Sequence, residues 1–393
     1  MADYHIEIDL QQKMPKGETA CGDVFYSRRI SEERRTILVL SDGIGHGVKA
    51  NVLATLTASM ALNYTSFHTR PEIAANIFMR ALPQSSEGKE SYATFTILEI
   101  EEGGMARIIN YDNPPTIILR YGEPFQPGET AIRIRGDQNA GKILRIKEFE
   151  PMLEDRILFF TDGITQSGLG SGRFPLGWEQ ELVQKFAEKQ IARDPEIAAT
   201  RLARKIINQA VINDDFKLKD DASCGVVYFR EPRDFMLVTG PPFYKNKDAD
   251  FVKQISEFQG KKIVCGGTTA EIIARELNLK LEIQQQSMDG AVPPVARMAG
   301  FEMITEGIIT LGKVEELLAN YTSETRLGNT APEAVAKLLL QHDIIHIILG
   351  TRINWVHQDP SQPVEVEIRK FVVKRIVKLL EEKFLRKVAV RYV

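Results

Sequence analysis

The chain has 393 residues, which is more than one hydrophobic core usually serves, and this length predicts two domains. Its 50 basic and 53 acidic residues leave a net charge of only −3, which argues against nucleic acid or an anionic membrane as a partner. Three scattered cysteines, no signal-peptide pattern and no apolar run of about 18 residues predict a soluble cytoplasmic protein without a membrane span.

The first 230 residues contain many short strands and two pairs of helices. Apolar and polar residues alternate over 4–10, which predicts a half-buried strand, and the apolar spacing becomes helical over 48–64 and 71–82. Further strands are predicted over 36–40, 92–100, 106–111, 116–120, 131–135, 143–146, 156–160 and 222–229, and further helices over 177–188 and 195–212. This order predicts an α+β fold of antiparallel sheets covered by helices, rather than a parallel βαβ arrangement.

The pattern changes after a charged, proline-containing stretch at 230–233 and a second stretch, Gly-Pro-Pro, at 240–242. Beyond it the sequence predicts buried strands over 262–265 and 344–349 and a long amphipathic helix over 364–384. We therefore expect a first domain over 1–232 and a smaller α/β domain over 235–393.

Acidic residues recur at the ends of predicted strands in the first domain. Asp42 and Asp162 each follow an apolar run and precede Gly-Ile, whereas Asp23 and Asp220 each precede a strand. Carboxylates held by rigid strands suit hard cations such as Mg²⁺ or Mn²⁺. Asp-Gly is also a common turn dipeptide, so on these residues alone a metal site and a set of simple turns are about equally favoured.

The strings around these aspartates resemble the ordered motifs of the metal-dependent (type 2C, PPM) protein phosphatases, and they are most similar to the SpoIIE-like branch. The strings are Cys21-Gly22-Asp23, Ser41-Asp42-Gly43-Ile44-Gly45-His46-Gly47, Asn113-Pro114-Pro115, Thr161-Asp162-Gly163 and Lys219-Asp220-Asp221-Ala222-Ser223. The resemblance covers residues 5–230.

The resemblance implies an α-β-β-α sandwich with two Mn²⁺ or Mg²⁺ ions at one end. Asp42 would bridge both ions, and the Gly43 carbonyl would bind the first. Asp162 and Asp220 would bind the second ion, and Asp23 would orient waters of the first. The implied activity is hydrolysis of phosphoserine or phosphothreonine in a protein substrate, in bacterial signalling, by a water that the two metals activate.

The chain departs from the family pattern in three places, one of which is that no basic phosphate-binding residue is identifiable near the first strand, where Arg28 and Arg29 are unsupported candidates. Ile44 stands where eukaryotic members have a histidine as a general acid, and His46, two residues further on, is not assigned that role. Leaving-group protonation is then expected from water. Tyr111 and Asp112 stand where the SpoIIE-like branch often has Gly-His, which affects substrate contacts and not the metal site.

The second domain contains a strand, a glycine turn and a helix start, with the residues Gly266, Gly267, Thr268 and Thr269 at the turn. Backbone N–H groups at such a helix start can bind an anion, and Arg352, after another strand, can add a cation. We hypothesise a small anionic ligand between these two segments that affects phosphatase activity. The alternative is a helix cap and a packing loop, because the turn lacks the lysine of a phosphate-binding P-loop.

Three interpretations of the whole chain remain. The first is an active phosphatase whose second domain senses a ligand or partner. In the second, a catalytically idle PPM-like domain serves as a regulatory or binding module. In the third, the main function is ligand binding by the C-terminal domain, and the phosphatase domain responds to that binding. The complete set Asp23, Asp42, Asp162 and Asp220 favours the active enzyme, and a homodimer is left open.

Overall fold

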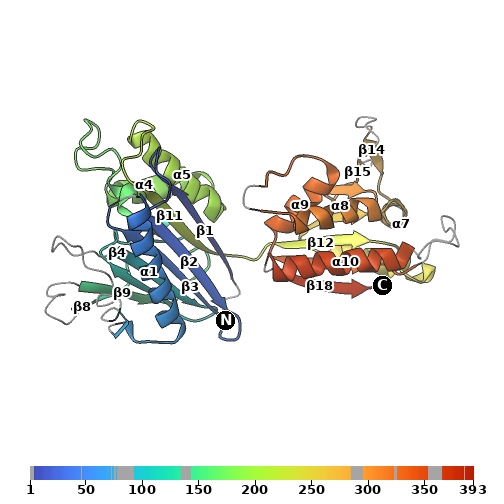
Figure 1. The fold of residues 1–393 in the computed structure, drawn as a ribbon. Coiled ribbons are helices and arrows are strands. Elements are labelled where there is room, and N and C mark those ends of the chain that lie inside the picture. Colours follow the sequence, from blue (N-terminus) through green and yellow to red (C-terminus); the bar gives the residue numbers. More distant parts are fainter. Residues whose placement is uncertain are drawn as a thin grey trace. The chain divides into compact units, whose positions relative to one another are not determined.

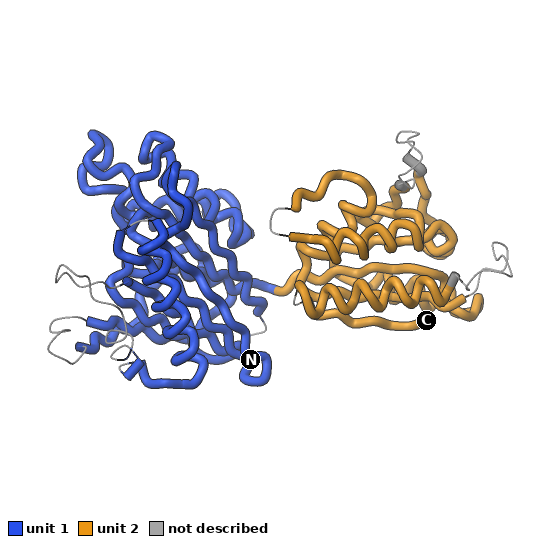
Figure 2. Tube along the Cα trace, in the orientation of Figure 1, with its two compact units in different colours: residues 1–231 blue, residues 232–393 orange. Residues whose placement is uncertain are grey.

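The computed structural model describes residues 4–45, 47–71, 73–74, 77, 93–133, 143–284, 295–322, 325–352, 365–384 and 386–393. The chain divides into two compact units, Met1–Glu231 and Pro232–Val393, drawn in blue and orange in Figure 2. Among the described residues, no helix combines the length and the apolar character that a membrane crossing requires.

The first unit contains two antiparallel sheets. The six-stranded sheet has the spatial order β2 (Asp23–Ile30), β3 (Arg35–Gly43), β4 (Ala93–Glu101), β5 (Ala106–Tyr111), β9 (Ile143–Phe149) and β8 (Glu129–Arg133). The five-stranded sheet has the order β1 (His5–Lys13), β11 (Ala222–Arg230), β10 (Arg156–Phe160), β6 (Ile117–Arg120) and β7 (Glu123–Pro124).

Three hydrophobic clusters arrange these sheets and helices in layers. The middle cluster joins the two sheets, for example Leu38 and Leu98 from one sheet with Phe159 and Val227 from the other. Helix α1 (Gly47–Ser66) packs on the outer face of the six-stranded sheet. Helices α4 (Gln180–Arg193) and α5 (Ala199–Asn213) cover the outer face of the five-stranded sheet (Figure 1). The predicted α-β-β-α sandwich is therefore confirmed. Of the helix predicted over 71–82, residues 71, 73, 74 and 77 are described and helical, and the others lie outside the described residues.

The second unit is built on one seven-stranded mixed sheet. Its order is β14 (Glu282–Gln284), β15 (Val295–Arg297), β16 (Met303–Thr305), β13 (Lys261–Cys265), β12 (Asp234–Thr239), β17 (Ile344–Leu349) and β18 (Lys387–Tyr392). The last five strands of this order are parallel, and β15 pairs antiparallel with both of its neighbours.

Helices cover both faces of this sheet. Helices α6 (Asp248–Glu257), which follows the short helix η2 (Lys245–Lys247), and α7 (Gly267–Leu277) pack on one face. Helices α8 (Ile308–Ala319), α9 (Ala331–Gln341) and α10 (Glu365–Glu382) pack on the other. The α/β class predicted for this region is confirmed.

Candidate metal centre

The two sheets of the first unit bring the motif aspartates to one end of the sandwich. Asp23 begins β2 and is the register partner of Asp42, near the end of β3. In the other sheet, Phe160 at the end of β10 pairs with Cys224 near the start of β11. Asp162 follows the first of these strands and Asp220 precedes the second, so these two residues lie at the same sheet end. The charges of Asp23, Asp162 and Asp220 all act on Asp42, which makes the four carboxylates one cluster.

Neither Asp-Gly pair is a turn, so the simple-turn interpretation is wrong for both. Asp42-Gly43 lies within β3, and Asp162-Gly163 opens the short helix α3 (Asp162–Thr165). A Cβ atom on Gly43 would lie 2.0 Å from the carbonyl oxygen of Ala50, and one on Gly163 would lie 2.2 Å from that of Asp221. These glycines are required because backbone from another segment touches them.

Asp23 is buried between the sheets and uses only one of its oxygens for hydrogen bonds. Thr161 Oγ1 donates to Asp23 Oδ2 over 2.8 Å, and Ser223 Oγ donates to the same atom over 2.5 Å. The Oδ1 atom is buried and has no hydrogen-bond partner among the described residues. Asp221 behaves alike: its Oδ2 accepts the Gly22 N–H over 2.8 Å, and its buried Oδ1 has no such partner in the described chain.

Burial raises the pKa of three carboxyl groups in this cluster, those of Asp23, Asp42 and Asp162. Burial is the main cause that raises the pKa of Asp23 to about 8, since it outweighs the hydrogen bonds from Ser223 and Thr161. Burial, with the charges of Asp23, Asp162 and Asp220, raises the pKa of Asp42 to about 10. Burial also raises the pKa of Asp162, which shares a hydrogen bond with Asp42.

These shifts predict how stability depends on pH in the metal-free protein. A carboxyl group with a raised pKa in the folded state binds its proton more tightly than in the unfolded chain. The free energy of unfolding therefore falls as pH rises from about 4 toward 8 for Asp23 and toward 10 for Asp42, by at most about 1.4 kcal/mol per pH unit for each group.

We expect the melting temperature in EDTA to fall between pH 6 and pH 8, and to fall less in Asp42→Asn. Thermal unfolding in a pH series measures both. A melting temperature that is flat or rising over this range would contradict the assigned burial of the cluster.

The residues present fit a pair of divalent cations by their donor chemistry. The cluster offers several carboxylates from two sheets and two buried carboxylate oxygens, those of Asp23 and Asp221, without partners among the described residues. Hard cations prefer such oxygen ligands and would neutralise the repulsion. Among the described residues, no three His, Cys, Asp or Glu side chains lie close enough together to hold one metal ion by themselves. Backbone carbonyls and water would therefore have to complete the ligand set. His46 lies outside the described residues.

Sequence reasoning assigned no role to three residues that contact the cluster, namely Thr161, Asp221 and Ser223. All three lie within the family-like motifs of the sequence, and this position is the feature from which their role could have been predicted. Asn113, also from a motif, is buried in the six-stranded sheet, where its Nδ2 donates to Thr96 Oγ1 over 3.1 Å.

In the second unit, Gly266–Thr269 and Arg352 follow β13 and β17, which both run parallel to β12 between them. Arg352 already forms an ion pair with the buried carboxylate of Asp248 over 2.7 Å, and Arg275 binds the other oxygen of Asp248 over 2.8 Å. Thr269 is buried, whereas Gly267 and Thr268 are exposed. In the described chain, no hydrogen bond joins Arg352 to 266–269. The guanidinium group of Arg352 instead donates to the Phe243 carbonyl and to Asp248.

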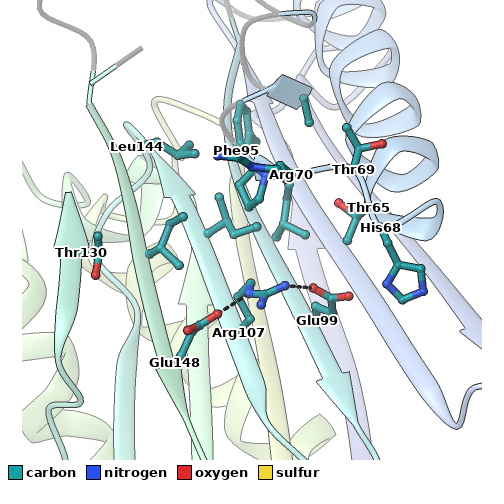
Figure 3. A pocket seen from close by; sticks show the side chains of 15 residues that line it. Thr65, His68, Thr69, Arg70, Phe95, Glu99, Arg107, Thr130, Leu144 and Glu148 are labelled. Carbon is teal, nitrogen blue, oxygen red and sulfur yellow. Dashed lines mark hydrogen bonds and ion pairs between the residues drawn. The ribbon is translucent and has the colours of Figure 1, made fainter. Parts of the chain in front are cut away.

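A cavity of about 430 Å³ lies elsewhere, on the outer face of the six-stranded sheet near the end of α1 (Figure 3). Arg107 crosses its floor and binds Glu99 over 3.0 Å and also Glu148. Aliphatic side chains such as Ile97 and Leu144 form the rest of the wall. The cavity contains none of the clustered aspartates and is not part of the metal centre.

The sandwich and its motif aspartates define a domain of the PPM phosphatase class. Residues 32–230, just over half of the chain, match the family model of stage II sporulation protein E (SpoIIE). The chain therefore belongs to the SpoIIE family. A comparison with curated protein sequences gives no significant match.

Solved structures with a similar fold share little sequence with the chain. The PP2C phosphatase domain of SpoIIE from Bacillus subtilis, with a fragment of its regulatory domain, is 16% identical with a TM-score of 0.47, and the match covers 58% of this chain and 64% of that one. The match thus spans less than two thirds of that chain. The RsbU and RsbW domains of a Mycobacterium tuberculosis protein are 19% identical with a TM-score of 0.47, covering 65% and 68%. RsbX in complex with magnesium is 18% identical with a TM-score of 0.38, covering 58% and 100%.

Proposed function

We propose that the chain is a metal-dependent phosphatase that hydrolyses phosphoserine or phosphothreonine in a protein substrate, in bacterial signalling. The observation that carries this proposal is that Asp23, Asp42, Asp162 and Asp220 come together from the ends of two different sheets, with the pKa values of Asp23, Asp42 and Asp162 raised. Such a concentration of buried negative charge is costly unless cations bind it. Family membership supports the same activity.

In this proposal each residue has a defined role. Asp42 would be shared by two Mn²⁺ or Mg²⁺ ions, with the Gly43 carbonyl on the first and Asp162 and Asp220 on the second. Asp23 would orient water at the first ion through its Oδ1 atom. When bound, the ions would lower the pKa of a water molecule and offset the charge that develops on the phosphate.

The cluster argues against a cysteine nucleophile. The charges of Asp23 and Asp221 act on the thiol of Cys21, and burial followed by these charges raises its pKa. A phosphatase that uses cysteine needs a thiolate, which positive neighbours favour and these neighbours oppose. Attack by water, with no covalent phosphoenzyme, is the mechanism that agrees with this environment.

The test is hydrolysis of p-nitrophenyl phosphate and of a phosphoserine peptide with Mn²⁺, with Mg²⁺ and in EDTA. We expect turnover with either ion, none in EDTA, and recovery when the ion is added back. Cys21→Ser should retain activity. Full activity in chelator, or trapping of a phosphoenzyme, would overturn the mechanism, and no turnover with any substrate would favour the catalytically idle module.

For residues 235–393 we propose a ligand-responsive domain that acts on the phosphatase. In support of an anionic ligand, the start of α7 at Gly267 and Thr268 is exposed, and its N-cap Gly266 makes no side-chain cap hydrogen bond. Arg352 is paired with Asp248, so a ligand between the two segments would share this arginine with that carboxylate.

A further inference from the structure

The Cys21–Asp23 segment, which enters β2, is held by side chains from the opposite sheet. Asp221 accepts the Gly22 N–H, while Thr161 and Ser223 donate to Asp23 Oδ2. We call these three residues, Thr161, Asp221 and Ser223, the inter-sheet clamp. Thr161 directly follows β10, Asp221 directly precedes β11 and Ser223 lies in β11, whereas Asp23 and Asp42 belong to β2 and β3.

The hydrogen-bond directions of the clamp are determined. Thr161 Oγ1 accepts the backbone N–H of Ser223 over 3.1 Å, and Ser223 Oγ accepts the side-chain amide of Gln12 over 3.0 Å. Each hydroxyl therefore receives one N–H and has its own proton available for Asp23 Oδ2. As a result, Asp23 Oδ2 accepts two hydrogen bonds, whereas Oδ1 accepts none from the described residues. This difference fixes the rotation of the carboxylate group about its bond to Cβ.

The clamp also sets how closely the two sheets approach at the cluster. A Cβ atom on Gly22 would lie 2.8 Å from Asp221 Oδ2, so the turn and the carboxylate are in direct contact. The backbone of the same Asp221 touches Gly163, next to Asp162. Asp221 thus lies between the segment that carries Asp23 and the helix that carries Asp162.

We infer that Thr161, Asp221 and Ser223, with Gln12 behind Ser223, are positioning residues that set the spacing between the two halves of the metal centre. The inference rests on the proposed function, because it assigns the clamp a role in ion binding. Groups that orient ligands from behind typically change metal affinity by about 10–100-fold. The clamp therefore controls ion affinity more than turnover at saturating ion.

The experiment compares full-length wild type with Ser223→Ala, Ser223→Thr and Gln12→Ala. Mn²⁺ affinity is measured by calorimetry, and phosphatase activity is titrated against Mn²⁺ concentration. We expect about 10–100-fold weaker Mn²⁺ binding in Ser223→Ala, restoration by the hydroxyl of Ser223→Thr, and kcat close to wild type once Mn²⁺ saturates. Gln12 is exposed, so Gln12→Ala should fold normally and show a smaller loss of affinity.

The control is Gln11→Ala, the neighbouring residue of β1, whose amide binds Asp9 and not the clamp. It should bind Mn²⁺ as wild type does. Unchanged Mn²⁺ affinity in both Ser223→Ala and Gln12→Ala, with an active wild type, would overturn the inference and leave the proposed function intact. Failure of wild type to bind Mn²⁺ would overturn the proposed function and the inference together.

Discussion

Replacing Asp42 by Asn is expected to lower turnover by orders of magnitude and to weaken the binding of both ions. Asp42 stands at the centre of the cluster, because the charges of Asp23, Asp162 and Asp220 all act on it. The amide keeps the size of the side chain but removes the charge that two cations would share. Steady-state kinetics with p-nitrophenyl phosphate across a Mn²⁺ titration measures the loss, and saturating Mn²⁺ should not restore it.

The matched control is Asp194→Asn, at the end of α4, where the carboxylate forms an exposed ion pair with Arg201 over 3.0 Å. This variant should keep wild-type kinetics, because exposed pairs contribute little. His46→Ala should cost much less than Asp42→Asn, since His46 does not occupy the family's acid position. Equal losses in His46→Ala and Asp42→Asn would show that the roles in this loop are assigned wrongly.

Replacing Gly163 by Ala is expected to destabilise the first unit strongly. The new Cβ would lie 2.2 Å from the carbonyl oxygen of Asp221, and that backbone cannot move aside without disturbing the start of β11. Overpacking in a well-packed interior typically costs about 1–3 kcal/mol, and we expect a loss at or above the upper end of this range. Urea unfolding in EDTA measures it without any contribution from bound ions.

Gly172→Ala is the matched control, because a Cβ at Gly172 meets nothing within 4 Å. Its free energy of unfolding should stay within about 0.5 kcal/mol of wild type. If Gly163→Ala were equally harmless, the close contact between α3 and Asp221 would not exist in solution.

The dipeptide Asp-Gly does not form a turn in either of its two motif copies in this chain. Asp-Gly favours turns, yet both copies lie in regular structure, because each glycine admits backbone from another segment. That contact is made by Ala50 in one case and by Asp221 in the other. No local rule predicts which distant backbone approaches a glycine.

The sequence by itself predicted most of the strands and helices of the first unit, its α+β class and the four aspartates of the candidate site. Periodicity over 4–10 and 156–160 reports which faces are buried, and the motif order identifies the four aspartates. These features are local, so each can be read without knowing the fold.

Only the tertiary structure decided which side chains meet. Asp23 and Ser223 are 200 positions apart and form a hydrogen bond because β2 and β11 lie in sheets that pack face to face. Arg352 binds Asp248, 104 positions away, a contact that the sequence did not predict. The strand β12 lies between β13 and β17 although it precedes both in the chain. Such pairings depend on packing between segments that are distant in sequence. Hydrophobic periodicity shows which face of an element is buried, but it does not show which other segment covers that face.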